Sequence, residues 1–249
     1  MRSVETELAV ADRVATAVAD VPPWLQALAW GGLGLAGLSA LVLLFDICLL
    51  RYRQRMPVME VVWPVTALYF GPVAVWMYLR YGRQQTRKWL TGHGREDPPD
   101  KPRWVTVAVG VGHCGAGCTL GDILAEILVF TVGIEWFGRA LWPEFAGDFT
   151  AALALGIVFQ YFAIAPMRGL GVREGLMRAA KADVLSLTAF EIGLFGWMAL
   201  MSYVFFPGPH LHPNTAAYWF LMQIGMIIGF ATSWPANVWL IRRGVKEAM

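Results

Sequence analysis

The chain has 249 residues, of which 57% are hydrophobic and 15% are charged, and its mean hydropathy is +0.51. Soluble globular domains are about 45–50% apolar and about 25% charged, so this composition excludes an ordinary soluble protein and an intrinsically disordered one. The net charge is +2 and the basic residues lie between apolar stretches, which argues against nucleic acid as a partner and indicates the loops of a membrane protein.

Residues 1–23 form the first predicted segment. They include Glu5, Glu7 and Asp12 and contain no apolar core followed by a cleavage site, so they lack the pattern of a secretory signal peptide. We expect this N-terminal segment to be amphipathic and to lie on the membrane surface.

Residues 24–249 form a single multi-span membrane domain in our interpretation. A hydrocarbon core about 30 Å thick requires about 20 apolar residues at 1.5 Å per residue. The sequence therefore predicts an all-α polytopic membrane protein with about six transmembrane helices. The windows that reach the required length are residues 24–50, 58–79, 104–134, 149–166, 184–206 and 215–241.

The second window, residues 58–79, allows an alternative. It contains Pro64 and Pro72, and proline in a helix interior removes a backbone hydrogen bond and disturbs the helix. The window could then be a re-entrant or interfacial segment, which would leave five spans and an external N-terminus. We prefer six spans because the window is long enough to cross the bilayer.

Basic residues between the windows determine the expected orientation, because cytoplasmic loops retain positive charge. Three stretches between or after the windows contain more Lys and Arg than Asp and Glu. They are residues 80–103, 167–183 and 242–249. Six spans place these stretches and both termini in the cytoplasm, in a multi-pass protein of the bacterial cytoplasmic (inner) membrane. The exception is residues 51–55, whose three arginines this arrangement leaves outside.

Residues 167–183 are predicted to form a short amphipathic interfacial helix. Apolar Leu176 and Met177 alternate there with basic Arg173 and Arg178. A helix with one apolar and one basic face is typical of the membrane surface.

Two pairs of glycines have the four-residue spacing that allows membrane helices to approach closely. They are Gly117 with Gly121, and Gly225 with Gly229. This common signal indicates close helix packing and does not identify a function.

The highest density of reactive side chains lies in the third window, in the stretch GHCGAGCTLGD. On a helix, Cys114, Cys118, Asp122 and Glu126 recur every four residues and share one face. His113 lies about 100° around the helix, and it could join them if the glycines unwind the backbone or a neighbouring helix completes the site. Thiolate and imidazole ligands suit Cu(I) or Zn(II). We therefore expect a copper or zinc site formed by His113, Cys114, Cys118 and Asp122.

An alternative explanation needs no metal ion. Cysteine is a small and often buried residue, and together with glycine it lets helices pack closely. Ionisable residues at membrane depth are costly and usually functional, however, and this favours a metal or redox site for the stretch around His113.

Further residues could extend this site into a path for a soft ion. Thioethers bind Cu(I) without losing a proton, and two histidines in the loop between the last two windows could capture a metal ion outside the membrane. Methionines at helical spacing also commonly serve as core filler. The candidate path residues are Met198, Met201, Met222, Met226, His210 and His212.

Buried carboxylates form a third group of candidates. Glu126 and Glu191 fall inside predicted spans, where burial favours the protonated form and makes a carboxyl group a possible proton carrier. The alternative is that they form structural hydrogen bonds between helices.

Four stretches resemble the bacterial membrane family described as domain of unknown function 4396. They are GHCGAGCTLGD, FQYFAIAPMRGL, KADVLSLTAFEIG and the C-terminal MQIGMIIGFATSWPANVWLIRRGVKEAM. The resemblance covers roughly residues 55–249. It implies a multi-span bacterial membrane protein and carries no established activity.

These observations lead to three functional hypotheses. The first is transport or delivery of a soft metal ion, with copper as the first choice, in which Asp122, Glu126 and Glu191 balance charge or carry protons. The second is a membrane redox protein that uses the two cysteines. The third is a non-catalytic assembly subunit. Besides the lipid bilayer, we expect a metal chaperone or a second copy of the chain as a partner.

Overall fold

The computed structural model describes residues 20–168 and 171–246, and within these ranges the protein is helical and contains no β-strand. The all-α polytopic fold predicted from the sequence is therefore confirmed. The predicted N-terminal segment lies outside the described residues except for its last four. The helices are α2 (Pro23–Leu44), α3 (Met59–Phe70), α4 (Pro72–Met77), α5 (Arg87–Gly92), α6 (Arg103–Val132), α7 (Leu141–Arg168), α8 (Val172–Leu200) and α9 (Ala216–Arg242).

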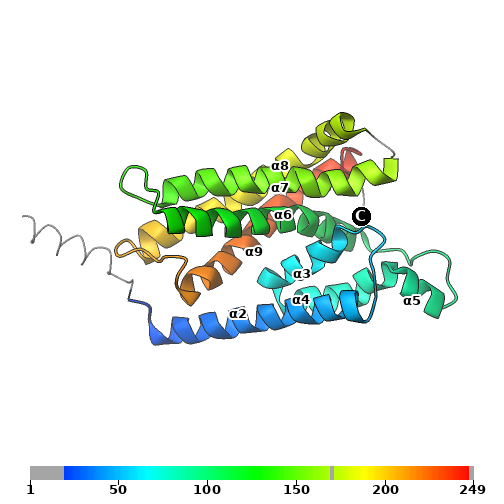
Figure 1. Ribbon diagram of the computed structural model, residues 1–249, viewed down its shortest axis with the longest axis horizontal. Helices are drawn as coiled ribbons and strands as arrows, with labels where there is room; N and C mark the ends of the chain where they lie inside the picture. Colours follow the sequence, from blue (N-terminus) through cyan, green and yellow to red (C-terminus); the bar gives the residue numbers. More distant parts are fainter. Residues whose placement is uncertain (1–19, 169–170, 247–249) are drawn as a thin grey trace, which may run out of the picture.

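The helices form two groups that pack against each other (Figure 1). The four long helices α6 to α9 make a bundle in which α6 contacts α7, α8 and α9. Helices α2 to α5 form the second group, and α2 and α3 attach it to α6 and α9. Helix α6 is therefore the central helix of the fold.

Five helices are long and apolar enough to cross a membrane. At the start of the fourth of these segments, residues 172–183 continue directly into α8, so the predicted interfacial helix is instead the first part of a long helix. The five segments are Pro23–Leu49, Arg103–Val132, Leu141–Ala163, Val172–Phe205 and Ala216–Arg242.

The second predicted window is a helical hairpin and not a span. Gly71 has a φ of +54° and a ψ of −129°, a conformation open to glycine but not to residues with a Cβ atom, and it separates α3 from α4. Figure 1 shows α3 entering the fold and α4 returning to the same end. The structure thus agrees with the re-entrant alternative.

Side chains from other helices hold this hairpin in place. The Gln223 side chain of α9 donates to the carbonyl of Leu68, at 2.6 Å, near the end of α3 where helix carbonyls lose their partners. On the return, Arg83 pairs with buried Asp46 at 3.0 Å, and the Tyr78 hydroxyl donates to the same carboxylate at 2.8 Å. Satisfied backbone and charged groups allow irregular structure at membrane depth.

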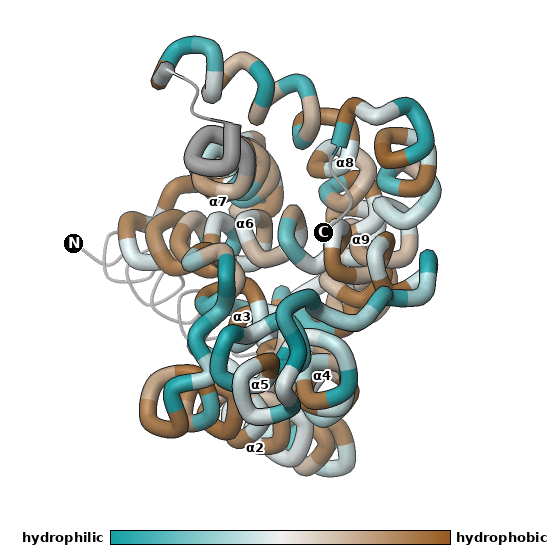
Figure 2. The backbone as a smooth tube through the Cα atoms, turned by 90° about the vertical axis from the view of Figure 1, so that its right-hand side faces the viewer, coloured by the Kyte–Doolittle hydropathy of each residue, from teal (hydrophilic) through white to brown (hydrophobic). Residues whose placement is uncertain are grey.

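The basic residues collect at one end of the fold. Among residues 20–168 and 171–246, every arginine and lysine except Arg139 lies at the end where α2 stops and α6 begins. Figure 2 views the molecule from this end and shows hydrophilic segments around α5. The arginines of residues 51–55 also belong to this end, because the hairpin replaces a span. Pro23 and Arg242 lie at opposite ends of the fold, so these helix ends do not share a side as six spans would require.

Close approach of helices at the predicted glycines is confirmed. A Cβ atom added to Gly121 would lie 2.4 Å from the backbone nitrogen of Ala152 on α7, and one on Gly117 would lie 2.9 Å from the Cα atom of Gly156. Real Cβ atoms do not approach so closely, so α6 and α7 meet backbone to backbone at these positions.

Candidate functional site

The face of α6 that carries the predicted ligands lies in the interior of the fold. The side chains of His113, Cys114, Cys118, Asp122 and Glu126 are all completely buried. Helix α6 runs between α3, α7, α8 and α9, so no part of this face is open to lipid. The residues that the sequence predicted to share one face of α6 therefore form a polar stripe enclosed by other helices.

The cysteines lie near one another and near carboxyl groups. Cys118 has Cys114 as its neighbour on α6. The carboxyl groups around Cys118 are those of Asp122, also on α6, and of Glu191 on α8. The structure thus adds Glu191 to the group around the thiols.

His113 belongs to a different environment. Its ring lies 6.3 Å from that of Phe159 on α7, measured between centroids, and the nearby charged group is Lys246. Neither ring nitrogen forms a hydrogen bond of normal length and angle with a described residue, although the backbone of Phe159 lies beside the ring. His113 therefore lies toward α7 and the C-terminal segment, whereas Cys118 lies near Glu191 of α8 and both cysteines lie near Tyr69 of α3.

In the described part of the chain, no group of three or more His, Cys, Asp or Glu side chains is arranged to hold a metal ion. The four residues His113, Cys114, Cys118 and Asp122 lie on one helix and do not form such a group.

A second acidic group, which was not predicted, faces α6 from α7. Glu144 and Asp148 are one helical turn apart and buried, and Glu126 lies close to both. The hydroxyl of Tyr218, at the start of α9, is another polar neighbour of Glu126. The four-residue spacing of Glu144 and Asp148 was visible in the sequence, but the predicted window began at residue 149 and excluded them.

These carboxyl groups lack the partners that buried charges normally have. No oxygen of Asp122, Glu126, Asp148 or Glu191 forms a hydrogen bond of normal length and angle with a described residue, although Tyr218 and Asp148 lie beside Glu126 and Cys118 lies beside Glu191. No arginine or lysine in that part of the chain forms an ion pair with any of them. Three helices therefore place acidic groups together, and no described residue supplies a compensating positive charge.

The half of the interior that lies toward the basic end of the fold, here called the basic half, has a different chemistry. Buried Asp183 of α8 pairs with Lys246 at 3.3 Å. The Asn237 side chain of α9 donates to the hydroxyl of Ser186 at 2.6 Å, and the Ser233 hydroxyl donates to the Ser186 carbonyl at 2.8 Å. This half is a hydrogen-bonded polar network with a balanced pair of charges.

The two halves follow one another along α6. His113 and Glu126 are about 20 Å apart along the helix axis at 1.5 Å per residue, a large part of a hydrocarbon core of about 30 Å. Gln160 of α7, also buried and without a hydrogen-bond partner among the described residues, lies on the basic half of that helix. Polar side chains thus extend through most of the fold.

A small cavity of about 60 Å³ lies at the acidic end, away from the basic loops. Its wall includes His210, His212, Met201 and Glu144, so the structure brings both predicted histidines to one place. Arg139 donates to Nε2 of His210 at 3.3 Å, while Nδ1 of His210 contacts the carbonyl of Phe206 at 2.8 Å. His212 is half-buried, and burial lowers its pKa, with His210 lowering it further.

The predicted methionines form a continuous group with the cysteines. All four are buried, and they belong to the same cluster of core residues as Cys114 and Cys118. The Thr119 hydroxyl of α6 donates to the sulfur of Met226 at 3.7 Å. Met201 belongs both to this cluster and to the wall of the small cavity.

Comparison with known proteins agrees with the resemblance in the sequence. The family model described as Domain of unknown function (DUF4396) matches residues 103–246. This range covers α6 to α9 and begins later than the expected residue 55, so α2 to α5 lie outside it. No curated protein and no solved structure matches the chain.

Proposed function

The chain belongs to the DUF4396 family, and we propose that the domain shared with this family, helices α6 to α9, transports a cation across the membrane with the help of protons carried on buried carboxyl groups. Copper(I) is the cation that we propose first, and the bacterial inner membrane is the proposed location.

The observation that carries this proposal is the uncompensated acidic group. Asp122, Glu126, Asp148, Glu144 and Glu191 are buried and have no ion-pair partner in the described residues. An isolated ionised carboxylate in a low-dielectric interior costs several kcal/mol. Each of these groups must therefore be neutralised by a proton or by a bound cation, as carboxylates in proton relays are.

The sulfur atoms support a soft ion as cargo. Thiol and thioether ligands select Cu(I) over hard cations such as Mg²⁺ and Ca²⁺. Four buried methionines lie in one cluster with Cys114 and Cys118, and Met201 also lines the cavity with His210 and His212. An ion could then pass from the histidines to the thiols by exchange between neighbouring ligands.

The distribution of charge supports an orientation of the fold in the membrane. Because cytoplasmic loops retain positive charge, we propose that the basic end of the fold faces the cytoplasm and that the cavity with His210 lies on the outer side. Entry of the ion would begin at this cavity. A chaperone that receives or delivers the metal remains part of the proposal.

A redox function of the cysteines is less well supported. Thiol exchange requires a thiolate that a partner can reach, and both Cys114 and Cys118 are completely buried.

Transport can be tested with the purified chain in liposomes that contain a pH indicator and a Cu(I) indicator. We expect external Cu(I) to enter and to change the internal pH, and we expect Asp122→Asn and Glu191→Gln to lose the pH change. Glu174→Gln is the matched control, because Glu174 is exposed and paired with Arg178. Liposomes with the wild-type chain that behave like empty liposomes toward both ions would overturn the proposal.

A further inference from the structure

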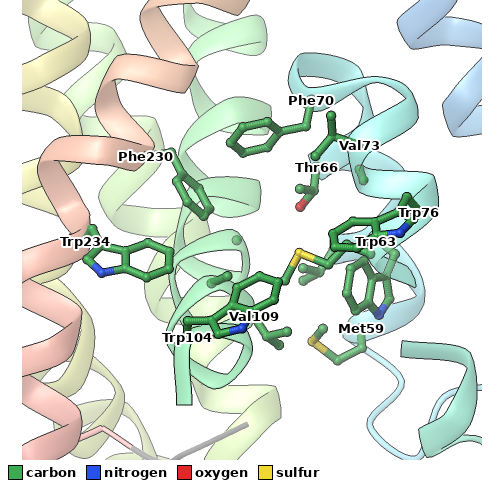
Figure 3. A pocket seen from close by; sticks show the side chains of 15 residues that line it. Met59, Trp63, Thr66, Phe70, Val73, Trp76, Trp104, Val109, Phe230 and Trp234 are labelled. Atoms are coloured by element: carbon green, nitrogen blue, oxygen red, sulfur yellow. The ribbon is translucent and has the colours of Figure 1, made fainter. Parts of the chain in front are cut away.

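An apolar cavity of about 290 Å³ lies between the hairpin and the long helices, separate from the polar interior (Figure 3). Figure 3 shows Phe70 and Trp76 on the hairpin side, Phe230 and Trp234 on α9, and Trp104 on α6 around the opening.

The chemistry of the wall restricts the ligand. None of the residues that line the cavity is charged, and most are aromatic or aliphatic. The hydroxyl of Thr66 and the indole N–H of Trp63 are buried and without a hydrogen-bond partner among the described residues. A wall that is apolar over most of its surface accepts a hydrocarbon.

The position of the cavity relates it to one membrane surface. Trp104 is the second residue of α6 at the basic end, and Gly112, also in the wall, lies about 12 Å deeper at 1.5 Å per residue. Val73, Trp76 and Trp104 each expose 44% or more of their surface, so the cavity opens on the face that meets lipid. A chain could therefore enter from the bilayer and lie along α6.

Positive charges lie beside the opening. Arg103 precedes Trp104 in the chain, and the Arg80 guanidinium lies 5.3 Å from the ring centroid of Tyr81, which packs edge-on against Trp104. Both arginines are exposed, and neither forms an ion pair with a described carboxylate. They are free to bind an anionic group at the membrane surface.

We propose that this cavity binds one acyl chain of an anionic phospholipid, whose headgroup is held by Arg80 and Arg103. The occupant would join the hairpin to α6 and α9, since their side chains form its wall. The site stands independently of the transport proposal, because it uses none of the buried carboxyl, thiol or thioether groups proposed to move ions.

Spin-labelled lipids provide the test. The purified chain is placed in phosphatidylcholine bilayers with a trace of phosphatidylglycerol or phosphatidylcholine that carries a label on the acyl chain. We expect a motionally restricted component in the spectrum, with phosphatidylglycerol preferred by at least about fivefold for each arginine. Lipids at the surface of the protein also give a restricted component, so the readout is the preference within it: Ala108→Phe, which fills the cavity, should lower the restricted fraction of phosphatidylglycerol to that of phosphatidylcholine, whereas Leu124→Phe on the exposed face of the same helix should leave it unchanged.

The headgroup is tested separately with two surface substitutions. Arg80→Gln combined with Arg103→Gln should abolish the preference for phosphatidylglycerol while the helix content, measured by circular dichroism, stays unchanged. Equal restriction of both lipids by the wild type, a preference that survives Ala108→Phe, or a preference that survives the double arginine substitution would each overturn the proposal.

Discussion

The ammonium group of Lys246 lies 3.3 Å from a carboxylate oxygen of Asp183, and both side chains are buried. Lys246 reaches this position because the chain turns back after α9. Gly244 has a φ of +67°, and the backbone N–H groups of Val245 and Lys246 donate to the carbonyl of Leu240. The C-terminal segment thus supplies a positive charge to the basic half of the interior.

Removal of this charge should destabilise the protein strongly. Lys246→Met leaves Asp183 buried without a partner, and we expect a loss of about 3–5 kcal/mol in the free energy of unfolding. Arg178→Met, which breaks an exposed pair with Glu174, should cost less than about 1 kcal/mol. Unfolding in detergent followed by circular dichroism measures both. Equal effects of the two substitutions would show that burial of the Lys246 pair is unimportant.

The contact between α6 and α7 should be sensitive to one methyl group. In Gly121→Ala the new Cβ atom would meet the backbone of Ala152 at 2.4 Å, so the helices must move apart, at a cost of about 1–3 kcal/mol. Gly110→Ala on the same helix is the control, since its nearest new contact, with Ile241, would be at 3.7 Å. Thermal unfolding of both variants is the measurement, and a Gly121→Ala variant as stable as Gly110→Ala would contradict the packing.

We expect the free energy of unfolding to fall at acid pH because of His212. Burial lowers its pKa, His210 lowers it further, and Glu135 opposes this. The folded state therefore favours the neutral imidazole, while the unfolded chain takes up a proton near the ordinary pKa of about 6.5. Stability that is present above this pH is lost as the pH falls.

The matching experiment compares melting temperatures at about pH 7.5 and about pH 5. The wild type should lose more stability than His212→Gln over this range, whereas His93→Gln, in an exposed position at the end of α5, should behave like the wild type. The same loss in His212→Gln as in the wild type would rule out this source of pH dependence.

Labelling of single introduced cysteines should show that α3 and α4 form a hairpin and not a span. In a background without Cys48, Cys114 and Cys118, Arg55→Cys and Glu96→Cys should react with an impermeant thiol reagent from the same side of the membrane. Asn214→Cys, in the loop before α9, should react from the other side. Labelling of positions 55 and 96 from opposite sides would instead restore a second span.

The sequence by itself predicted the properties that depend on local patterns. Hydropathy and length identified the membrane class and five of the six windows as helices long enough to span. The four-residue repeat of Cys114, Cys118, Asp122 and Glu126 was found to be a buried face of α6. Such properties follow from the period of one helix and from the solvent around it.

The hairpin illustrates where local patterns are insufficient. An apolar stretch containing Pro64 and Pro72 is compatible with a kinked span and with two short helices. The backbone conformation at Gly71 and the hydrogen bond from Gln223 to Leu68, more than 150 residues apart in the chain, decide for the hairpin.

The sequence alone thus determined the membrane environment, the helical class and the polar stripe on α6. Only the tertiary structure placed Glu144 and Asp148 opposite Glu126, gave His113 different neighbours from Cys118, and brought Lys246 to Asp183. The physical reason is that contacts between helices depend on how each helix is rotated and where close approach at small residues such as Gly121 allows it to pack. Neither quantity is set by the hydropathy or period of a single segment.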